Sequence, residues 1–309
     1  MKISVIGAGN VGSLTAMRIA QENLGEVVLY DIVKGLAQGK ACDLQDSRGI
    51  LKNNYIIRGT DDIAQISASD IVVITAGLAR KPGMSREDLL HKNAEILKSL
   101  VLNIKKSSPD SILVIVTNPL DIMTYLALKI SGFAKHKVLG MGVTLDASRF
   151  ANLISQELNV PVSEIEPALL GSHSETMIPL PRLTNINGSS LSTRLSPNEI
   201  STLIDRTKNR GAEIVSLLGN ASAFFAPSAA ITDIIKSIAR DQKRKLAVSV
   251  YLKGEYGIND LCLGVPCILG RDGVQEIIEL DLLASEKSLL LESAQILRKN
   301  LEIIKPYLS

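Results

Sequence analysis

Residues 2–12 read Lys2-Ile-Ser-Val-Ile6-Gly7-Ala-Gly-Asn-Val-Gly12, and this stretch decides the fold. A short apolar run ends in three glycines with the spacing G-x-G-x-x-G, and a helical pattern follows from Val11 to about Ala20. A second apolar run, Val27 to Tyr30, ends at Asp31. Strand, glycine turn, helix and strand in this order predict one right-handed βαβ unit.

The glycine turn has the form that binds a dinucleotide. Gly7 permits the tight turn, Gly9 lets the main chain approach a pyrophosphate, and Gly12 allows close packing of helix on strand. The pyrophosphate would lie at the positive N-terminus of the helix. Asp31 can accept hydrogen bonds from the adenosine ribose, and its charge would repel a 2′-phosphate, which favours NAD over NADP. A glycine turn that binds nothing is the weaker alternative.

The remaining elements place this unit in a larger α/β protein. Runs 70–75 and 111–117 are continuous and β-branched, as in parallel strands covered on both faces. Between them one helical stripe contains Leu90, Ala94, Leu97, Val101 and Ile104. After residue 143 we expect helices at 146–158 and from Ser196, strands at 246–252 and 261–269, and a closing helix with Leu290, Ala294, Leu297, Leu301 and Ile304 on one face. We therefore predict an N-terminal Rossmann domain with a doubly wound parallel sheet, residues 1–143, and a C-terminal α+β substrate domain, residues 144–309.

Composition limits the function. The 309 residues have a formal net charge of +2 and 3% aromatic residues with no Trp, which disfavours nucleic acid as a partner. Three scattered cysteines suit neither a disulfide framework nor a four-ligand zinc site. No metal is expected. The absence of a signal-like leader or a spanning apolar segment indicates no membrane partner and a cytoplasmic location.

Polar residues follow two predicted strands, where ligands bind in open α/β sheets. Arg80 and Arg86 bracket Pro-Gly in a loop, 78–90, that could close over a site, and two arginines suggest an acidic substrate. A solvated basic loop is the alternative. Asn118 precedes Pro119 and is therefore held extended, with its amide toward the same crevice.

Three further residues are candidates for chemistry. His173 is one of three histidines and can exchange a proton near neutral pH, although a lone histidine is more often structural. Asp146 and Arg149 are three apart at the start of a predicted helix and share a face. An ordinary surface ion pair is the competing interpretation of these two.

Six motifs together resemble the lactate/malate dehydrogenase family along essentially the whole chain, closest to its bacterial lactate-dehydrogenase-like malate dehydrogenases. They are Gly7–Gly12, Arg80-Lys-Pro-Gly-Met-Ser-Arg86, Val116-Thr-Asn-Pro119, Leu145-Asp-Ala-Ser-Arg149, Gly171-x-His173 and Gly219-Asn-Ala-Ser-Ala-Phe-Phe-Ala-Pro227, in the family's order.

The resemblance implies the site. His173 corresponds to the proton donor and acceptor, and Asp146 to the carboxylate that holds its ring. Arg149 corresponds to the residue that binds the substrate's C1 carboxylate, Arg86 to the loop arginine that polarises the carbonyl, and Asn118 to a substrate contact beside the nicotinamide. The implied NAD contacts are Gly7, Ala8, Gly9, Asn10, Val11, Gly12, Asp31, Asn93, Val116, Thr117 and Asn118.

Arg80 indicates the substrate class. Relatives that use lactate usually have Gln at this position, facing a methyl group, whereas an arginine would pair with a second carboxylate. The expected reaction is therefore NAD-dependent interconversion of (S)-malate and oxaloacetate. The resemblance also implies the tricarboxylic acid cycle and a homo-oligomer, a tetramer rather than a dimer.

Three alternatives remain open. They are a lactate or broad 2-hydroxy-acid dehydrogenase, an NAD-dependent glycosidase, and a catalytically dead nucleotide-binding protein. The chain also departs from the family after the histidine, because Ser174-Glu175 stands where most members have Gly-Asp. Loss of glycine removes access to positive φ, so the local main-chain geometry is in question.

Overall fold

The computed structural model describes residues 1–78, 85–219 and 221–308, and the main chain alone for Arg86. Its N-terminal half alternates strands and helices: β1 (Lys2–Ile6), α1 (Asn10–Gln21), β2 (Glu26–Tyr30), α2 (Leu36–Leu51), β3 (Ile57–Thr60), η1 (Ile63–Ile66), β4 (Ile71–Ile74), α3 (Arg86–Ser107), β5 (Ile112–Ile115), α4 (Leu120–Ser131), η2 (Lys135–Lys137) and β6 (Val138–Gly140). All pairs in the order β3-β2-β1-β4-β5-β6 are parallel. The predicted doubly wound sheet is confirmed.

The C-terminal half mixes helices with antiparallel strands, as predicted. Its elements are α5 (Gly142–Leu158), η3 (Val162–Glu164), β7 (Ile165–Glu166), β8 (Leu169–Gly171), β9 (Met177–Pro179), β10 (Asn185–Ile186), β11 (Ser189–Ser190), η4 (Leu191–Thr193), α6 (Pro197–Leu218), α7 (Phe225–Ala239), β12 (Arg244–Lys253), η5 (Glu255–Gly257), β13 (Asn259–Gly270), β14 (Gly273–Ile277), α8 (Ala284–Ile304) and η6 (Lys305–Tyr307). Strands β7, β10 and β11 form a small separate sheet.

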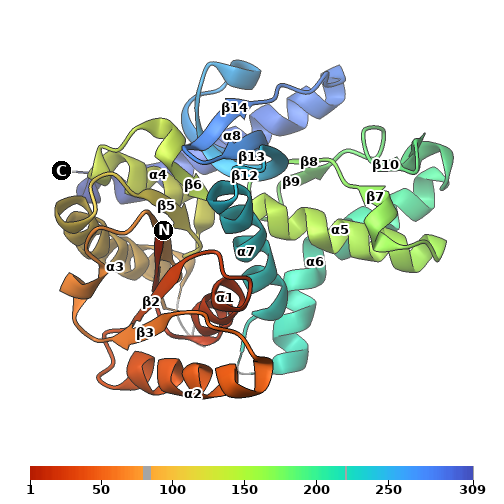
Figure 1. Cartoon of the computed structure of the whole chain (residues 1–309). Helices are drawn as coiled ribbons and strands as arrows, with labels where there is room; N and C mark the ends of the chain where they lie inside the picture. Colours follow the sequence, from red (N-terminus) through yellow and green to blue (C-terminus); the bar gives the residue numbers. More distant parts are fainter. Residues whose placement is uncertain (79–84, 220, 309) are drawn as a thin grey trace.

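The two halves share one sheet. Ser249 of β12 pairs antiparallel with Gly140 of β6, and the sheet continues through β13, β8 and β9. The C-terminal half therefore extends the parallel sheet instead of only packing against it (Figure 1). The domain boundary predicted at residue 143 falls at the start of α5 and remains a prediction.

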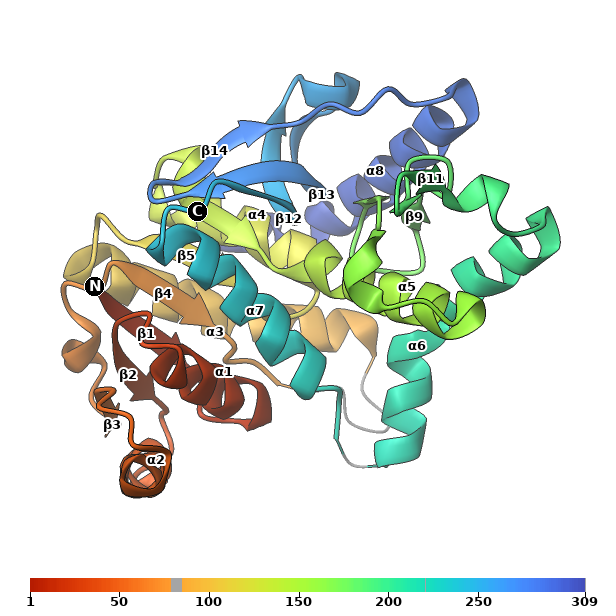
Figure 2. The ribbon, with the colours of Figure 1, turned by 45° about the vertical axis from the view of Figure 1, so that its right-hand side comes forward.

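Helices cover the sheet in two groups. Helices α1 and α7 contact each other, and α5 also contacts α7 (Figure 2). Helices α3, α4 and α8 contact one another. Helix α7 of the C-terminal half contacts α1 of the N-terminal half, and α8 contacts α3 and α4. Helix packing as well as hydrogen bonding therefore joins the halves. None of the helices in the described ranges has the length and apolar character needed to cross a lipid bilayer.

Helix α3 leads into the site and begins earlier than its stripe suggested. The five stripe residues are at most 3% exposed, as predicted. Its N-terminus is a capping box in which Ser85 Oγ accepts from Asp88 N and Asp88 accepts from Ser85 N. Residues 86–90, assigned to the loop, are therefore helical. Residues 79–84, including Arg80, lie outside the described ranges. The capping box predicted at Ser196 and Glu199 is confirmed.

Candidate active site

His173 lies in the turn between β8 and β9, and its ring meets Asp146 of α5. The His173 Nδ1 to Asp146 Oδ2 distance is 2.6 Å, and the Asp146 side chain is fully buried. Because an ionised carboxylate can only accept, Nδ1 carries the proton. This leaves Nε2 as the nitrogen that can take a proton from a ligand or give one to it.

Arg149 completes a buried cluster, so the surface ion pair interpretation is wrong. Its Nη1 lies 3.2 Å from Asp146 Oδ1, and the Arg149 side chain is 13% exposed. Arg149 Nε is buried and has no hydrogen-bond partner among the described residues. Burial lowers the pKa of Arg149 and the Asp146 charge opposes this. The Asp146 contact uses one of the two terminal nitrogens, so the guanidinium keeps terminal N–H donors that an acidic ligand could use.

The pKa of His173 is raised above its ordinary value. Burial, the largest influence, favours the neutral ring, but the charge and hydrogen bond of Asp146 favour the imidazolium and outweigh it together with the charge of Asp121. Arg149 opposes protonation. The ring is consequently prepared to hold a proton near neutral pH, as an acid–base group requires.

Asp121 is a site residue that sequence reasoning missed. It lies in the first turn of α4 and is 4% exposed. Its Oδ2 accepts from His173 N at 2.9 Å and from Ser172 Oγ at 3.0 Å, and its Oδ1 accepts from Ser249 Oγ at 2.6 Å. An acidic residue within the apolar segment 120–128 was the available signal, because buried carboxylates need partners.

The glycine loop has the shape that a dinucleotide requires. Gly7 has φ of +103°, and a Cβ on Gly12 would lie 1.8 Å from Gly7 O, so neither position accepts another residue without a shift. A Cβ on Gly9 would meet nothing within 4 Å. Gly9 is also the N-cap of α1 and provides no side-chain cap. The first-turn N–H groups of Asn10 and Val11 are therefore available to a pyrophosphate, and the loop fits the predicted cofactor.

Two charged residues brace this loop. Asp31 Oδ2 accepts from Ala8 N at 2.6 Å, and its Oδ1 accepts from Val33 N at 2.9 Å. Lys40 of α2, which the sequence did not single out, donates from Nζ to Ala8 O at 2.6 Å and to Ser13 Oγ at 3.0 Å. Asp31 thus stands beside the loop as predicted, and its ribose contact remains a prediction.

Asn93, Thr117 and Asn118 hold the ends of β4 and β5 together. Asn93 Oδ1 accepts from Leu78 N at 2.8 Å, and its Nδ2 donates to Asn118 O at 2.8 Å. Thr117 Oγ1 donates to Ala76 O at 2.6 Å. The Asn118–Pro119 peptide is cis, which the sequence did not indicate. The amide of Asn93 bridges main chain here, so its direct cofactor contact, like that of Val116, remains a prediction.

The turn after His173 accommodates the departure from the family pattern. The residue with left-handed conformation is Gly171, with φ of +95°, and Ser174 has no positive φ. Ser174 Oγ accepts from Thr176 N at 3.2 Å. Serine at position 174 therefore imposes no left-handed strain, and the geometry of His173 is retained.

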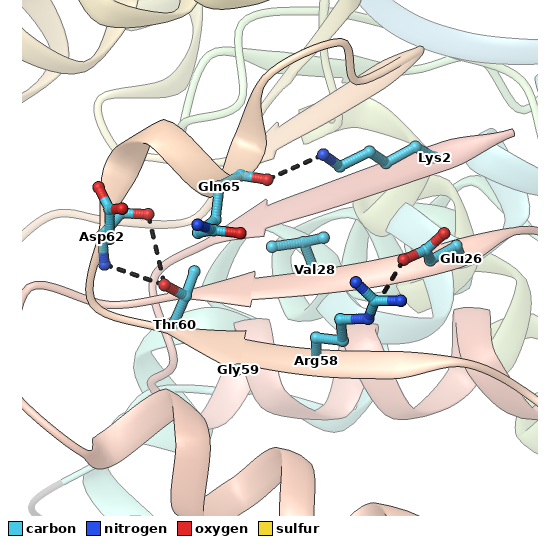
Figure 3. Close-up of a pocket in the computed structure, with 8 residues that line it drawn as sticks. All are labelled: Lys2, Glu26, Val28, Arg58, Gly59, Thr60, Asp62 and Gln65. Carbon is cyan, nitrogen blue, oxygen red and sulfur yellow. Dashed lines mark hydrogen bonds and ion pairs between the residues drawn. The ribbon is translucent and has the colours of Figure 1, made fainter.

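The side chains of Arg80 and Arg86 lie outside the described part of the structure, so their predicted substrate contacts remain predictions. A separate hollow of about 220 Å³ lies against β1, β2 and β3 (Figure 3). Lys2 Nζ donates there to the main-chain oxygens of Gln65 and Ser67, and Arg58 pairs with Glu26 at 3.5 Å. None of the predicted site residues lines this hollow, and we assign it no ligand.

A Rossmann half set against a second half with a buried acid–base pair defines the class of nicotinamide-dependent dehydrogenases. Comparison with known proteins identifies the family. Residues 1–140 match the lactate/malate dehydrogenase NAD binding domain, and residues 143–306 match the lactate/malate dehydrogenase alpha/beta C-terminal domain. The chain belongs to the lactate/malate dehydrogenase family, is an oxidoreductase and uses NAD. This membership removes the glycosidase alternative.

Individual relatives agree. The malate dehydrogenase of Methanosarcina mazei is 48% identical over 301 residues, which are 97% of this chain and 98% of that protein. The apo malate dehydrogenase of Picrophilus torridus has a TM-score of 0.96 and 39% identity, covering 99% and 98% of the two chains. The malate dehydrogenase of Plasmodium falciparum, solved with NADH, has a TM-score of 0.93 and 36% identity over 100% of both.

Proposed function

We propose that this protein is an NAD-dependent malate dehydrogenase that interconverts (S)-malate and oxaloacetate. The observation that carries the proposal is the buried cluster in which the Asp146 carboxylate holds the His173 ring with one oxygen and Arg149 with the other. The relatives named above are malate dehydrogenases, which supports the choice of substrate.

His173, Asp146 and Arg149 have separate roles in the proposed reaction. In malate oxidation neutral His173 removes the hydroxyl proton through Nε2, and Asp146 stabilises the imidazolium that forms. Arg149, whose contact with Asp146 uses Nη1, would bind the C1 carboxylate through its remaining terminal N–H donors. The glycine loop at residues 7–12 would hold NAD, which would supply the acceptor for the hydride from C2 of malate and, as NADH, the donor of that hydride to oxaloacetate. For reduction, His173 must begin protonated, which its raised pKa favours.

Arg80 determines which substrate is used. Arg86 polarises the substrate carbonyl, and Asn118 contacts the substrate beside the nicotinamide. Malate differs from lactate by one carboxylate, and an arginine facing the pyruvate methyl would be an unpaired charge. A lactate or broad 2-hydroxy-acid dehydrogenase is the competing function within the family.

The test compares NADH oxidation with oxaloacetate, pyruvate and 2-oxoisovalerate. We expect kcat/KM for oxaloacetate to exceed the other two by orders of magnitude. Arg80→Gln should lose most oxaloacetate activity, while pyruvate activity falls less or rises. Equal losses with both substrates would remove Arg80 from substrate selection.

His173→Asn should bind NADH as the wild type does but lose turnover, and retained turnover would contradict the acid–base role.

We also infer a homo-oligomer, a tetramer or a dimer. Large apolar side chains are exposed on the loop after β2, on α2 and at the end of α6, including Ile32 at 84%, Ile50 at 86% and Leu217 at 80%. Gel filtration with light scattering determines the number of subunits. The cytoplasmic location and the role in the tricarboxylic acid cycle remain predictions.

A further inference from the structure

Asp121 connects the segment that contains Asn118 to the turn that contains His173. It follows Asn118-Pro119 by two residues, in the first turn of α4. From there its carboxylate accepts the main-chain N–H of His173 and the hydroxyls of Ser172 and Ser249. One rigid helix start therefore fixes both a predicted substrate contact and the predicted proton carrier.

A carboxylate at this place is not explained by stability. Helix α4 is buried along almost its whole length, so the carboxylate is taken out of water, and its hydrogen bonds mainly offset the cost of that burial. The charged group that favours ionised Asp121 is His173, whose main-chain N–H also donates to it.

The titratable and charged groups around Asp121 come from three elements. They are His173 in the turn after β8, Asp146 and Arg149 of α5 beyond the His173 ring, and Cys262 of β13, whose pKa is raised by burial and also by the Asp121 charge. The pKa of Asp121 is raised by burial, and the hydrogen bonds from Ser249, His173 and Ser172 and the charge of His173 offset this only in part. The acceptor role toward His173 is fixed, since a main-chain N–H can only donate.

We propose that Asp121 is a positioning residue for His173. It fixes the main chain at residues 172–173 so that the ring meets Asp146, and its negative charge favours the imidazolium. The proposal rests on the proposed role of His173 as the proton carrier. It adds a second carboxylate, which acts through the main chain and the charge of His173 and does not contact the substrate.

The decisive variant is Asp121→Asn, which retains the shape and one carbonyl acceptor but removes the charge. The chain has three histidines, so ring titrations followed by NMR can be assigned, and His91 and His136 serve as internal references. We expect the His173 midpoint to move to lower pH while the other two stay unchanged. We also expect kcat for oxaloacetate to fall about tenfold to a hundredfold, because small misplacement of an acid–base group is costly.

Asp260→Asn is the matched control. Asp260 accepts from Tyr125, Lys129 and Tyr251, so this variant removes a hydrogen-bonded carboxylate that makes no contact with His173. We expect an unchanged His173 midpoint and unchanged turnover. NADH affinity should be that of the wild type in both variants.

An unchanged His173 midpoint in Asp121→Asn, or wild-type kcat per folded enzyme, would overturn the proposal. If Asp121→Asn does not fold, Asp121→Glu decides, because it retains the charge but moves the carboxylate by one methylene relative to the main-chain N–H of His173. Its kcat for oxaloacetate should fall while NADH affinity stays that of the wild type, and wild-type kcat per folded enzyme would overturn the proposal. The titration midpoint measures the charge of the His173 ring and does not require turnover, so it tests the role of Asp121 alone. Failure of the proposed function would instead appear as retained activity in His173→Asn.

Discussion

The two oxygens of Asp146 serve two different cations, and this division determines the protonation chemistry of the site. Oδ2 holds the ring of His173 and Oδ1 pairs with Arg149, all within a nearly water-free cluster. The carboxylate offsets the burial that would otherwise keep His173 neutral. Because the folded pKa of His173 is raised, its bound proton adds stability below the ordinary pKa. That contribution is lost as pH rises through the raised pKa.

Asp146→Asn should therefore change the pH dependence of catalysis. In the wild type, kcat/KM for oxaloacetate should fall, and that for malate should rise, as pH increases through the raised pKa of His173. Without the carboxylate the pKa of His173 falls, so the pH profiles for oxaloacetate and for malate should both shift to lower pH. The rate of oxaloacetate reduction at neutral pH should drop roughly 100- to 10,000-fold. Steady-state profiles in both directions test this, with NADH affinity as the control. A variant that keeps the wild-type profile would contradict the assigned coupling.

At the level of elements, the turn between β1 and α1 uses its glycines for two separate purposes. Gly12 is required by the protein itself, since its Cα faces Gly7 O across the turn. Gly9 has an ordinary φ of −69° and open space where a Cβ would be, so the protein does not need glycine there. A bound pyrophosphate would need that space.

A pair of alanine variants should separate these purposes. Gly12→Ala should destabilise the fold by at least about 1–3 kcal/mol, the usual cost of overpacking. Gly9→Ala should change stability by about 1 kcal/mol or less. It should nevertheless weaken NADH binding tenfold or more, equivalent to about 1.4 kcal/mol. Thermal unfolding and NADH fluorescence titration measure the two effects. Wild-type NADH affinity in Gly9→Ala would show that the cofactor does not approach this residue.

The same elements show how far sequence reasoning reaches. Helix α3 and the start of α6 were predictable because an apolar stripe and a capping box are local patterns. Helices α4 and α7 have many buried positions and mostly apolar residues, so no stripe distinguished them. The cluster of His173, Asp146 and Arg149 was recognisable through motifs. Asp121 was not, because its three hydrogen-bond donors are contributed by positions 172, 173 and 249.

The larger of two hydrophobic cores belongs to both halves of the molecule, whereas the smaller lies within the C-terminal half. The larger hydrophobic cluster includes Ile3 and Leu113 from the N-terminal half and Ile234, Leu263 and Leu297 from the C-terminal half. The pairing of β6 with β12 adds main-chain continuity. Local sequence patterns could not indicate this, because the contact between residues 140 and 249 depends on the complete topology.

A shared sheet and core predict that the chain unfolds as one unit. Calorimetry should give a single transition, and NADH at about 100 times its Kd should stabilise the entire protein by about 2.7 kcal/mol. Probes in both halves should report the same shift, although the predicted cofactor contacts all lie in the first half. A Trp placed at Ser201, an exposed site on α6, provides the C-terminal reporter that this Trp-free chain lacks. If NADH moved an N-terminal transition and left the α6 reporter unchanged, the halves would be independent units and the continuous sheet would not couple them.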